Sequence, residues 1–184
     1  MRPKIMLPSA HFRFCPACGA SSAREAGASP FECAGCGFTY YFSAAIGTAA
    51  FLKRPDGRML FIRRSRDPGK GLLALPGGFI DIGERAEEAL RRELREEVGL
   101  EIDPPEFLTS FTNRYLFRNI TYPVLDLFFV ATAREPERAR ALDDVEALAW
   151  KDPLTELDPA ELAFDSMRQA LEVLCGRLRA GVQP

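Results

Sequence analysis

The sequence has no excess of charge of either sign and no long apolar run. It contains 24 basic and 26 acidic residues, for a formal net charge of -2. The chain as a whole therefore offers no electrostatic basis for binding nucleic acid or an anionic membrane. No apolar run approaches the roughly 18 residues of a membrane span, and residues 1–10 lack the continuous apolar segment of a secretory signal. These absences predict a cytoplasmic protein without a membrane partner.

The length and composition indicate a folded main domain with a small appendage. A chain of 184 residues has room for one domain of about 130 to 150 residues and little more. Hydrophobic residues make up 47% and charged residues 27% of the chain, which is far from the composition of a disordered protein. No internal repeat is visible. We place the small domain at 11–42 and the main domain at 43–182.

Four of the five cysteines form two Cys-x-x-Cys pairs, Cys15 with Cys18 and Cys33 with Cys36. Fourteen residues separate Cys18 from Cys33, a spacing typical of a structural zinc site with four thiolate ligands. A glycine after each pair permits the tight turn that such a site needs. Four protein ligands leave no coordination position open, so this zinc ribbon is expected to stabilise the fold and not to catalyse. The alternative is a redox or disulfide role, which an odd number of cysteines favours less.

Other residues in or near this cluster allow competing roles. A zinc ribbon can bind nucleic acid, but from its first cysteine onward the ribbon has only Arg24 as a basic residue, against Glu25 and Glu32. We therefore favour a structural or dimer-forming ribbon over a nucleic-acid reader. The single histidine, His11, is expected to lie on the surface or to pack, because four thiolates already complete the metal site. Cys175 falls on an apolar stripe, and we assign it no function.

Hydrophobic spacing and turn residues predict the secondary structure. Strands are expected at 45–52, 58–64, 107–117, 122–132 and 145–150, and helices at 84–98 and 159–180. In the first helix Leu90, Leu94 and Val98 recur at four-residue steps, and Gly99 stands where a helix ends. The stretch Pro76-Gly77-Gly78 is expected to interrupt regular structure. The order of the elements predicts an α/β fold with a mixed sheet flanked by helices.

Three acidic residues of the first predicted helix, Glu93, Glu96 and Glu97, share one helix face. Such a cluster is costly without a cation, and its hard oxygen ligands suit Mg2+ or Mn2+. The alternative is a solvated acidic face. In that case the carboxylates would pair with interleaved arginines, which are Arg91, Arg92 and Arg95.

A wider pattern surrounds this helix: Gly78, five residues, Glu84, seven residues and then Arg92-Glu93-Leu94-Arg95-Glu96-Glu97-Val98-Gly99-Leu100. It resembles the Nudix box at every defined position, and a match to nine constrained positions over 23 residues is improbable by chance. The resemblance covers roughly residues 45–180 and implies the Nudix fold. It also implies that Glu93, Glu96 and Glu97 bind a divalent metal, with the carbonyl of Gly78 as a further ligand. Glu84 and Arg92 would form a salt bridge between the loop and the helix.

The same resemblance implies a reaction. A metal-activated water would attack a diphosphate phosphorus while the cations neutralise charge on the phosphates and the leaving group. A general base is needed, and we rank Glu97 or Glu93 first. Asp144 and Glu146, just before Trp150, are the alternatives, although both could simply be acids at the edge of a strand.

Substrate contacts are expected from two further groups of residues. The arginines at positions 63, 64 and 66 could contact phosphates or carboxylates, with Arg64 preferred, or could simply be charged residues at the end of a strand. Aromatic residues gather after the box, where the family often stacks a base between rings. They are Phe111, Tyr115, Phe117 and Tyr122, and we select Tyr115.

A zinc ribbon directly before a Nudix domain is similar to the arrangement in the bacterial NADH pyrophosphatase group, whose members hydrolyse dinucleotides and can remove NAD caps from RNA. The Ser-Gln-Pro-Trp-Pro-Phe-Pro-x-Ser stretch usual in that group is replaced here by Leu-Thr-Ser-Phe-Thr-Asn-Arg-Tyr at 108–115. We expect a homodimeric, magnesium-dependent pyrophosphohydrolase that cleaves a nucleoside diphosphate linked to another moiety, such as NADH, NAD or ADP-ribose. The alternative is a catalytically silent nucleotide sensor that uses the ribbon to bind nucleic acid or protein, although its box would be expected to have decayed.

Overall fold

The computed structural model describes residues 7–22 and 29–181. The chain divides into two compact units, one of residues up to 45 together with 114–124, and one of residues 46–113 with 125 onward. Some sequence-based expectations lie outside the described residues, namely the stretch 1–6, Arg24 and Glu25 of the ribbon, and the predicted domain end at 182. No helix in the described part of the chain is long and apolar enough to cross a membrane.

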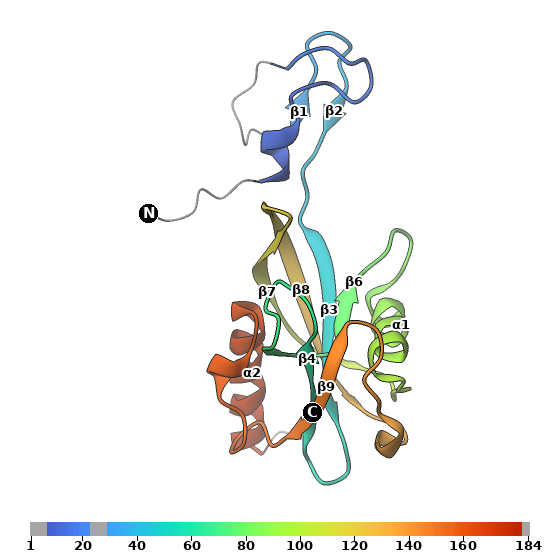
Figure 1. The fold of residues 1–184 in the computed structure, drawn as a ribbon, viewed down its shortest axis with the longest axis vertical. Coiled ribbons are helices and arrows are strands. Elements are labelled where there is room, and N and C mark those ends of the chain that lie inside the picture. Colours follow the sequence, from blue (N-terminus) through green and yellow to red (C-terminus); the bar gives the residue numbers. More distant parts are fainter. Residues whose placement is uncertain (1–6, 23–28, 182–184) are drawn as a thin grey trace. The chain divides into compact units, whose positions relative to one another are not determined.

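The first unit is called the N-terminal unit, and its residues 7–22 and 29–45 contain little regular structure. The 3-10 helix η1 (Pro8–His11) ends at an exposed His11, and it precedes a two-stranded antiparallel sheet of β1 (Phe31–Glu32) and β2 (Thr39–Tyr40) (Figure 1). The small core around this sheet consists of Cys15, Phe31 and Cys33, with Phe12, Ala20, Phe38 and Phe42 packed against it. An apolar core of this size stabilises a fold poorly unless a metal or disulfides cross-link it.

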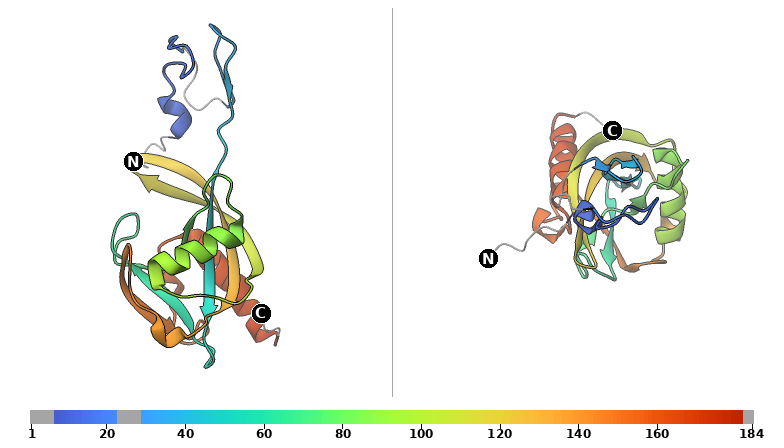
Figure 2. Two further views of the ribbon diagram at one scale, coloured as in Figure 1. Left: turned by 90° about the vertical axis from the view of Figure 1, so that its right-hand side faces the viewer. Right: turned by 90° about the horizontal axis from the view of Figure 1, so that it is seen from above.

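The largest sheet has seven strands. They are β3 (Ala45–Lys53), β4 (Met59–Arg64), β5 (Leu73–Ala74), β6 (Gly77–Phe79), β7 (Glu106–Phe117), β8 (Ile120–Thr132) and β9 (Val145–Lys151). The strand order is β5-β4-β3-β8-β7, with β6 paired to β3 and β9 paired to β4. The helices α1 (Ala86–Val98) and α2 (Asp165–Arg179) lie on opposite sides of this sheet (Figures 1 and 2). Two further 3-10 helices are η2 (Pro136–Arg138) and η3 (Pro159–Glu161). This arrangement confirms the predicted α/β fold.

The core follows the apolar pattern of the sequence. β3 is buried continuously from Gly47 to Leu52, because helices cover both faces of the sheet, and a strand in that position has no polar face. The apolar stripe of α1, extended by Ala89, is also buried. At the end of α1, Gly99 adopts the left-handed conformation with φ of 68°, and its N–H donates to the carbonyl of Arg95, as the predicted helix stop requires.

The expectation that Pro76-Gly77-Gly78 interrupts regular structure holds at Pro76, which lies between β5 and β6, but was wrong for the two glycines. Gly77 begins the short strand β6, which pairs with β3 through Ala49↔Gly77 and Thr48↔Gly78. Gly77 has a φ of 143°, and a Cβ at this position would overlap the carbonyl oxygen of Thr48. Glycine therefore allows the close approach of two backbones here and does not end the pairing.

The last helix starts later than its hydrophobic spacing predicted. After η3, the N–H of Ala163 donates to the carbonyl of Leu73 at 2.8 Å, and Leu162 forms a parallel bridge with Leu73. This pairing holds the chain extended beside β5, so α2 begins only at Asp165. The sequence could not reveal it, because the partner lies nearly ninety residues away.

Candidate active site

Two of the three box glutamates reach from α1 to the backbone of β6. The side chain of Glu97 accepts a hydrogen bond from the N–H of Gly77, with 2.8 Å between Oε2 and N. A Cβ at Gly78 would overlap the carboxylate of Glu93. The absence of a side chain at Gly78 is therefore what lets Glu93 lie directly against the strand.

Arg92 organises the neighbouring acids. Its guanidinium donates to both carboxylate oxygens of Glu84, at 3.1 and 2.9 Å, which confirms the predicted salt bridge between loop and helix. It also donates to Glu93 at 2.7 Å and to the exposed Glu96 at 3.3 Å. A further bond to the carbonyl of Phe79 at 3.0 Å links α1 to the end of β6. The alternative of a solvated acidic face, in which arginines pair with the carboxylates, is therefore only partly met. Arg92 pairs with Glu93 and Glu96, whereas Glu97 bonds to the backbone of β6.

Burial strongly affects the charge of the glutamates. The pKa of Glu97 is raised to about 8, chiefly by burial, which the Gly77 N–H opposes and the negative charge of Glu93 reinforces. Burial also raises the pKa of Glu93, although Arg92 counteracts this. Two half-buried carboxylates held close together favour protonation unless a cation is present. The pair is therefore a set of hard oxygen donors suited to a divalent cation.

The loop before β9 caps the carboxyl end of α1. The N–H of Leu142 donates to the carbonyl of Glu97 at 3.0 Å, and the N–H of Asp143 donates to that of Glu96 at 3.3 Å. The charge of Asp143 contributes to the raised pKa of Glu97, so this acid is electrostatically coupled to the site. Sequence reasoning had overlooked Asp143 in favour of its neighbour Asp144. The only available signal was the acidic run itself.

The alternative general bases, Asp144 and Glu146, do not share the contacts of the box glutamates. Asp144 forms an ion pair with Arg66, and its carbonyl accepts hydrogen bonds from the backbone and hydroxyl of Ser65, at 3.1 and 2.8 Å. Glu146 is exposed on β9. These contacts give Asp144 a role in fastening the loop to the end of β4.

Arg64, the predicted phosphate contact, is half-buried near the glutamates. Its positive charge lowers the pKa of Glu97, which indicates that it acts on the same site. Its Nε donates to the carbonyl of Pro68 at 2.7 Å, and its guanidinium lies 5.2 Å from the ring centre of Phe164. Tyr115 lies on β7, in the segment 114–124 that is grouped with the other compact unit.

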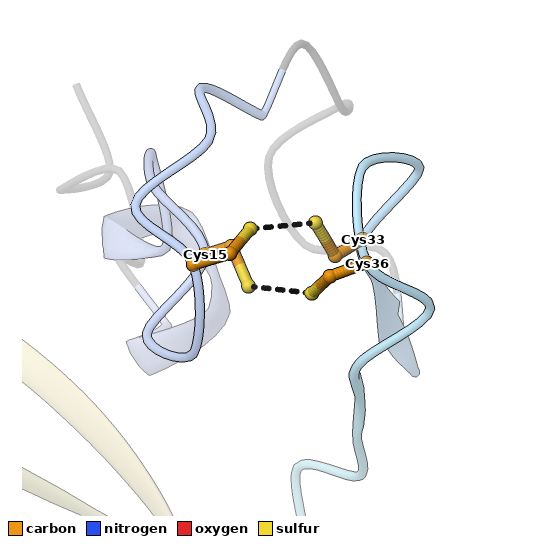
Figure 3. A group of neighbouring side chains, drawn as sticks. Cys15, Cys33 and Cys36 are labelled. Atoms are coloured by element: carbon orange, nitrogen blue, oxygen red, sulfur yellow. Dashed lines mark hydrogen bonds between the residues drawn. The ribbon is translucent and has the colours of Figure 1, made fainter.

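The four paired cysteines converge in the N-terminal unit. All four sulfur atoms lie within 4.8 Å of one another, and the separations Cys15 to Cys36 and Cys18 to Cys33 are both 3.7 Å (Figure 3). A tetrahedron of thiolates at a Zn–S distance of about 2.3 Å would have sulfurs about 3.8 Å apart. The backbone N–H of Cys36 contributes most to lowering the pKa of Cys33 to about 7, which favours the thiolate that binds metals. Against the N–H of Phe38, the neighbouring sulfurs raise the pKa of Cys36 to about 12, so a cation is needed to hold the whole cluster as thiolates. All four thiols are free, so the cluster is positioned to bind a metal ion.

Comparisons with known proteins agree with this geometry. The family model of the NUDIX domain matches residues 44–174. An NAD-capped RNA hydrolase of Stutzerimonas stutzeri is 33% identical over 53% of this chain and 35% of its own. An ADP-ribose pyrophosphatase of Methanocaldococcus jannaschii is 41% identical over 34% of this chain and 37% of its own. The matches thus span little more than a third of either relative.

A solved structure supports the fold over nearly the whole chain. The NUDIX hydrolase of Nitrosomonas europaea superposes with a TM-score of 0.75, covering 94% of each chain at 19% identity. This likeness concerns the fold alone. The family match covers well over half of the sequence and includes both the acidic helix and the strand it contacts. The chain therefore belongs to the Nudix family.

Proposed function

We propose that the protein is a magnesium-dependent pyrophosphohydrolase, with Mn2+ as a substitute, that cleaves a nucleoside diphosphate linked to another moiety. The observation that carries this proposal is the position of Glu93 and Glu97, whose carboxylates lie against β6 at Gly78 and Gly77. The names of the relatives, an NAD-capped RNA hydrolase and an ADP-ribose pyrophosphatase, support NADH, NAD or ADP-ribose as the substrate.

The donor set fits a hard divalent cation. Glu93, Glu96 and Glu97 would supply carboxylate oxygens, and Gly78 would supply a backbone carbonyl. The close approach of the Glu93 carboxylate to the backbone of Gly78 and the elevated pKa of Glu97 both suit a cation. When bound, the cation would lower the pKa of a water molecule and neutralise phosphate charge.

The other side chains receive roles by their position. Glu97, or else Glu93, would accept the proton of the attacking water. Arg64 would stabilise negative charge on a phosphate, since it already acts electrostatically on Glu97. Tyr115 would stack on a base of the substrate, and this role rests on the sequence pattern. Asp143 would add negative charge beside the cation.

The burial of Glu97 predicts proton release when Mg2+ binds. A carboxyl group with a pKa of about 8 is mostly protonated at pH 7, whereas a metal ligand must be a carboxylate. The apparent Mg2+ affinity should therefore rise with pH until about pH 8 and then level off. Titration calorimetry at pH 7 in buffers of different ionisation enthalpy would measure the protons released. A binding heat that does not depend on the buffer would contradict this prediction.

We propose further that residues 11–42 form a zinc ribbon in which Cys15, Cys18, Cys33 and Cys36 bind Zn2+, and that residues 43–182 form the Nudix domain. Borderline-soft Zn2+ prefers thiolates, whereas Mg2+ prefers the oxygen ligands of the other site. The free thiols are compatible with a reducing compartment such as the cytoplasm. A homodimer is proposed as well, and light scattering coupled to size-exclusion chromatography would test it. Capped RNA is a candidate substrate because of the name of one relative.

A hydrolysis screen tests the proposed function. Zinc-loaded protein would be incubated with Mg2+ and NADH, NAD, ADP-ribose, nucleotide sugars, dinucleoside polyphosphates or nucleoside triphosphates, and products would be identified by chromatography. We expect cleavage within a diphosphate, which from NADH would yield AMP and reduced nicotinamide mononucleotide. Inactivity of the folded, metal-loaded protein toward every compound would support the alternative, a nucleotide sensor without catalytic activity.

A further inference from the structure

Thr48 on β3 contains a buried hydroxyl group without a partner. Thr48 is only 2% exposed to solvent. Among the described residues, Oγ1 of Thr48 is the one buried side-chain oxygen or nitrogen atom for which no hydrogen bond is found. Burying a hydroxyl in this way destabilises a fold, and such groups are rare in native proteins. The position therefore calls for a reason other than packing.

The register of the sheet places this hydroxyl beside the proposed metal site. Thr48 and Gly78 are directly paired across the antiparallel strands β3 and β6. Side chains of paired residues leave the sheet on the same face, with Cβ atoms about 4.5–5.5 Å apart. The position that a Cβ would take at Gly78 is filled by the carboxylate of Glu93. The side chain of Thr48 thus projects from the face on which Glu93 lies, one strand away from that carboxylate.

A neutral hydrogen-bond donor beside Glu93 would help this carboxylate to bind a cation. Its Oε1 accepts a hydrogen bond from Arg92 at 2.7 Å, an interaction that competes with a cation for the same oxygen. Carboxylates that bind metals are commonly held in place by hydrogen bonds from neighbouring groups. Thr48 is neutral and can donate without repelling a cation, unlike the guanidinium of Arg92.

We propose that Thr48 is a positioning residue of the metal site, whose hydroxyl donates a hydrogen bond to the carboxylate of Glu93 when a divalent cation binds. The inference rests on the proposed function, because it assumes that Glu93 is a ligand. In the metal-free protein the hydroxyl remains without a partner, at a cost in stability. In the metal-bound protein it gains a partner and orients the carboxylate. The same group then weakens the metal-free fold and strengthens cation binding.

Thr48 is thus expected to lower the stability of the metal-free protein and to raise its affinity for a cation. A role in packing alone would not produce these two opposite effects. A threonine in a buried strand could be present only because β-branched residues pack well there. In that case Thr48→Val, which keeps the shape and removes the hydroxyl, would stabilise the metal-free and metal-bound protein equally. If Thr48 positions Glu93, the same substitution would stabilise only the metal-free protein and would weaken the metal complex.

The test compares wild type with Thr48→Val, Thr48→Ser and the exposed control Thr132→Val. Mn2+ affinity would be measured by calorimetry, and melting temperature would be recorded with and without Mn2+. We expect Thr48→Val to melt higher without metal and to bind Mn2+ roughly 10- to 100-fold more weakly, and Thr48→Ser to retain most of the affinity. The control should match wild type in affinity.

Two other outcomes would overturn the proposal in distinguishable ways. If wild type binds Mn2+ and Thr48→Val binds it within about twofold of wild type, the hydroxyl does not position Glu93, while the proposed function stands. If wild type itself binds neither Mn2+ nor Mg2+, the inference and the proposed function fail together. Both measurements are independent of turnover, so they require no knowledge of the substrate.

Discussion

Replacing Glu97 by glutamine should reduce the rate of diphosphate hydrolysis by about 10²- to 10⁴-fold, which is the usual contribution of a general base. Glutamine retains the shape of the side chain and an oxygen that can accept the bond from Gly77. It removes the negative charge and the basic oxygen. The kcat of both proteins would be measured at saturating Mg2+ with the best substrate from the screen.

A matched control for this variant is Glu87→Gln, at an exposed position in the first turn of the same helix. This change removes the same charge from α1 but leaves the site intact, so kcat should stay within about twofold of wild type, as for most surface substitutions. If Glu97→Gln retained activity comparable to this control, Glu97 would be neither an essential ligand nor the base.

Glu97→Gln should also change how stability depends on pH. The pKa of Glu97 is about 8 in the folded, metal-free protein and about 4.3 in an unfolded chain. Between these values the folded state holds the proton more tightly, so the free energy of unfolding of wild type falls as pH rises. The variant has no carboxyl group at this position and should lack this part of the fall. Urea denaturation at pH 5 and pH 8.5 without Mg2+ would reveal the difference, and parallel pH profiles would contradict the assigned burial.

Removing the zinc ion that we propose for the four cysteines is expected to unfold the N-terminal unit. Among its described residues the core has three buried side chains, and the binding energy of a structural zinc, about 10–16 kcal/mol in small peptides, serves as folding energy. Cys33→Ser should abolish stoichiometric zinc binding, because Cys33 contributes one of the four converging sulfurs. Metal content would be measured by mass spectrometry, and protection of the N-terminal region by hydrogen exchange.

The matched control for the ribbon is Cys175→Ser. This cysteine is buried on α2, and its thiol donates to the carbonyl of Pro153 at 3.5 Å. The substitution should leave zinc content unchanged and affect only the stability of the main core. A full complement of zinc in Cys33→Ser would overturn the four-thiolate site. If the four cysteines of the untreated, metal-free protein did not react with a thiol reagent, the alternative of disulfide bonds would be supported instead.

Local patterns were sufficient for most elements of the fold. The helix α1 could be predicted because its apolar stripe, its acidic start and the stop at Gly99 all act within one segment. The two long strands β7 and β8 were also predicted, at 107–117 and 122–132, within two residues of their observed bounds. By contrast, β6 and the delayed start of α2 depend on pairing with β3 and β5. Each of these partners is distant in sequence, so no local rule could anticipate them.

Only some features of the candidate site could likewise be predicted from the sequence. The box alone indicated Glu93, Glu96 and Glu97 as a group, since helical spacing puts them on one face. It did not indicate that Glu97 bonds to the backbone of Gly77 while Glu96 stays exposed. Nor did it indicate the electrostatic effect of Asp143, which depends on how a loop some forty residues later caps the helix.

The sequence by itself determined the family, the acidic helix and the paired cysteines, because each is encoded by residue types at short, fixed spacings. The tertiary structure alone decided which acids are buried, which strand they contact and that the hydroxyl of Thr48 lies buried on the same face. Burial and register arise when separate segments pack together. They set the pKa of Glu97 and the surroundings of Glu93, and so the chemistry that the site can perform.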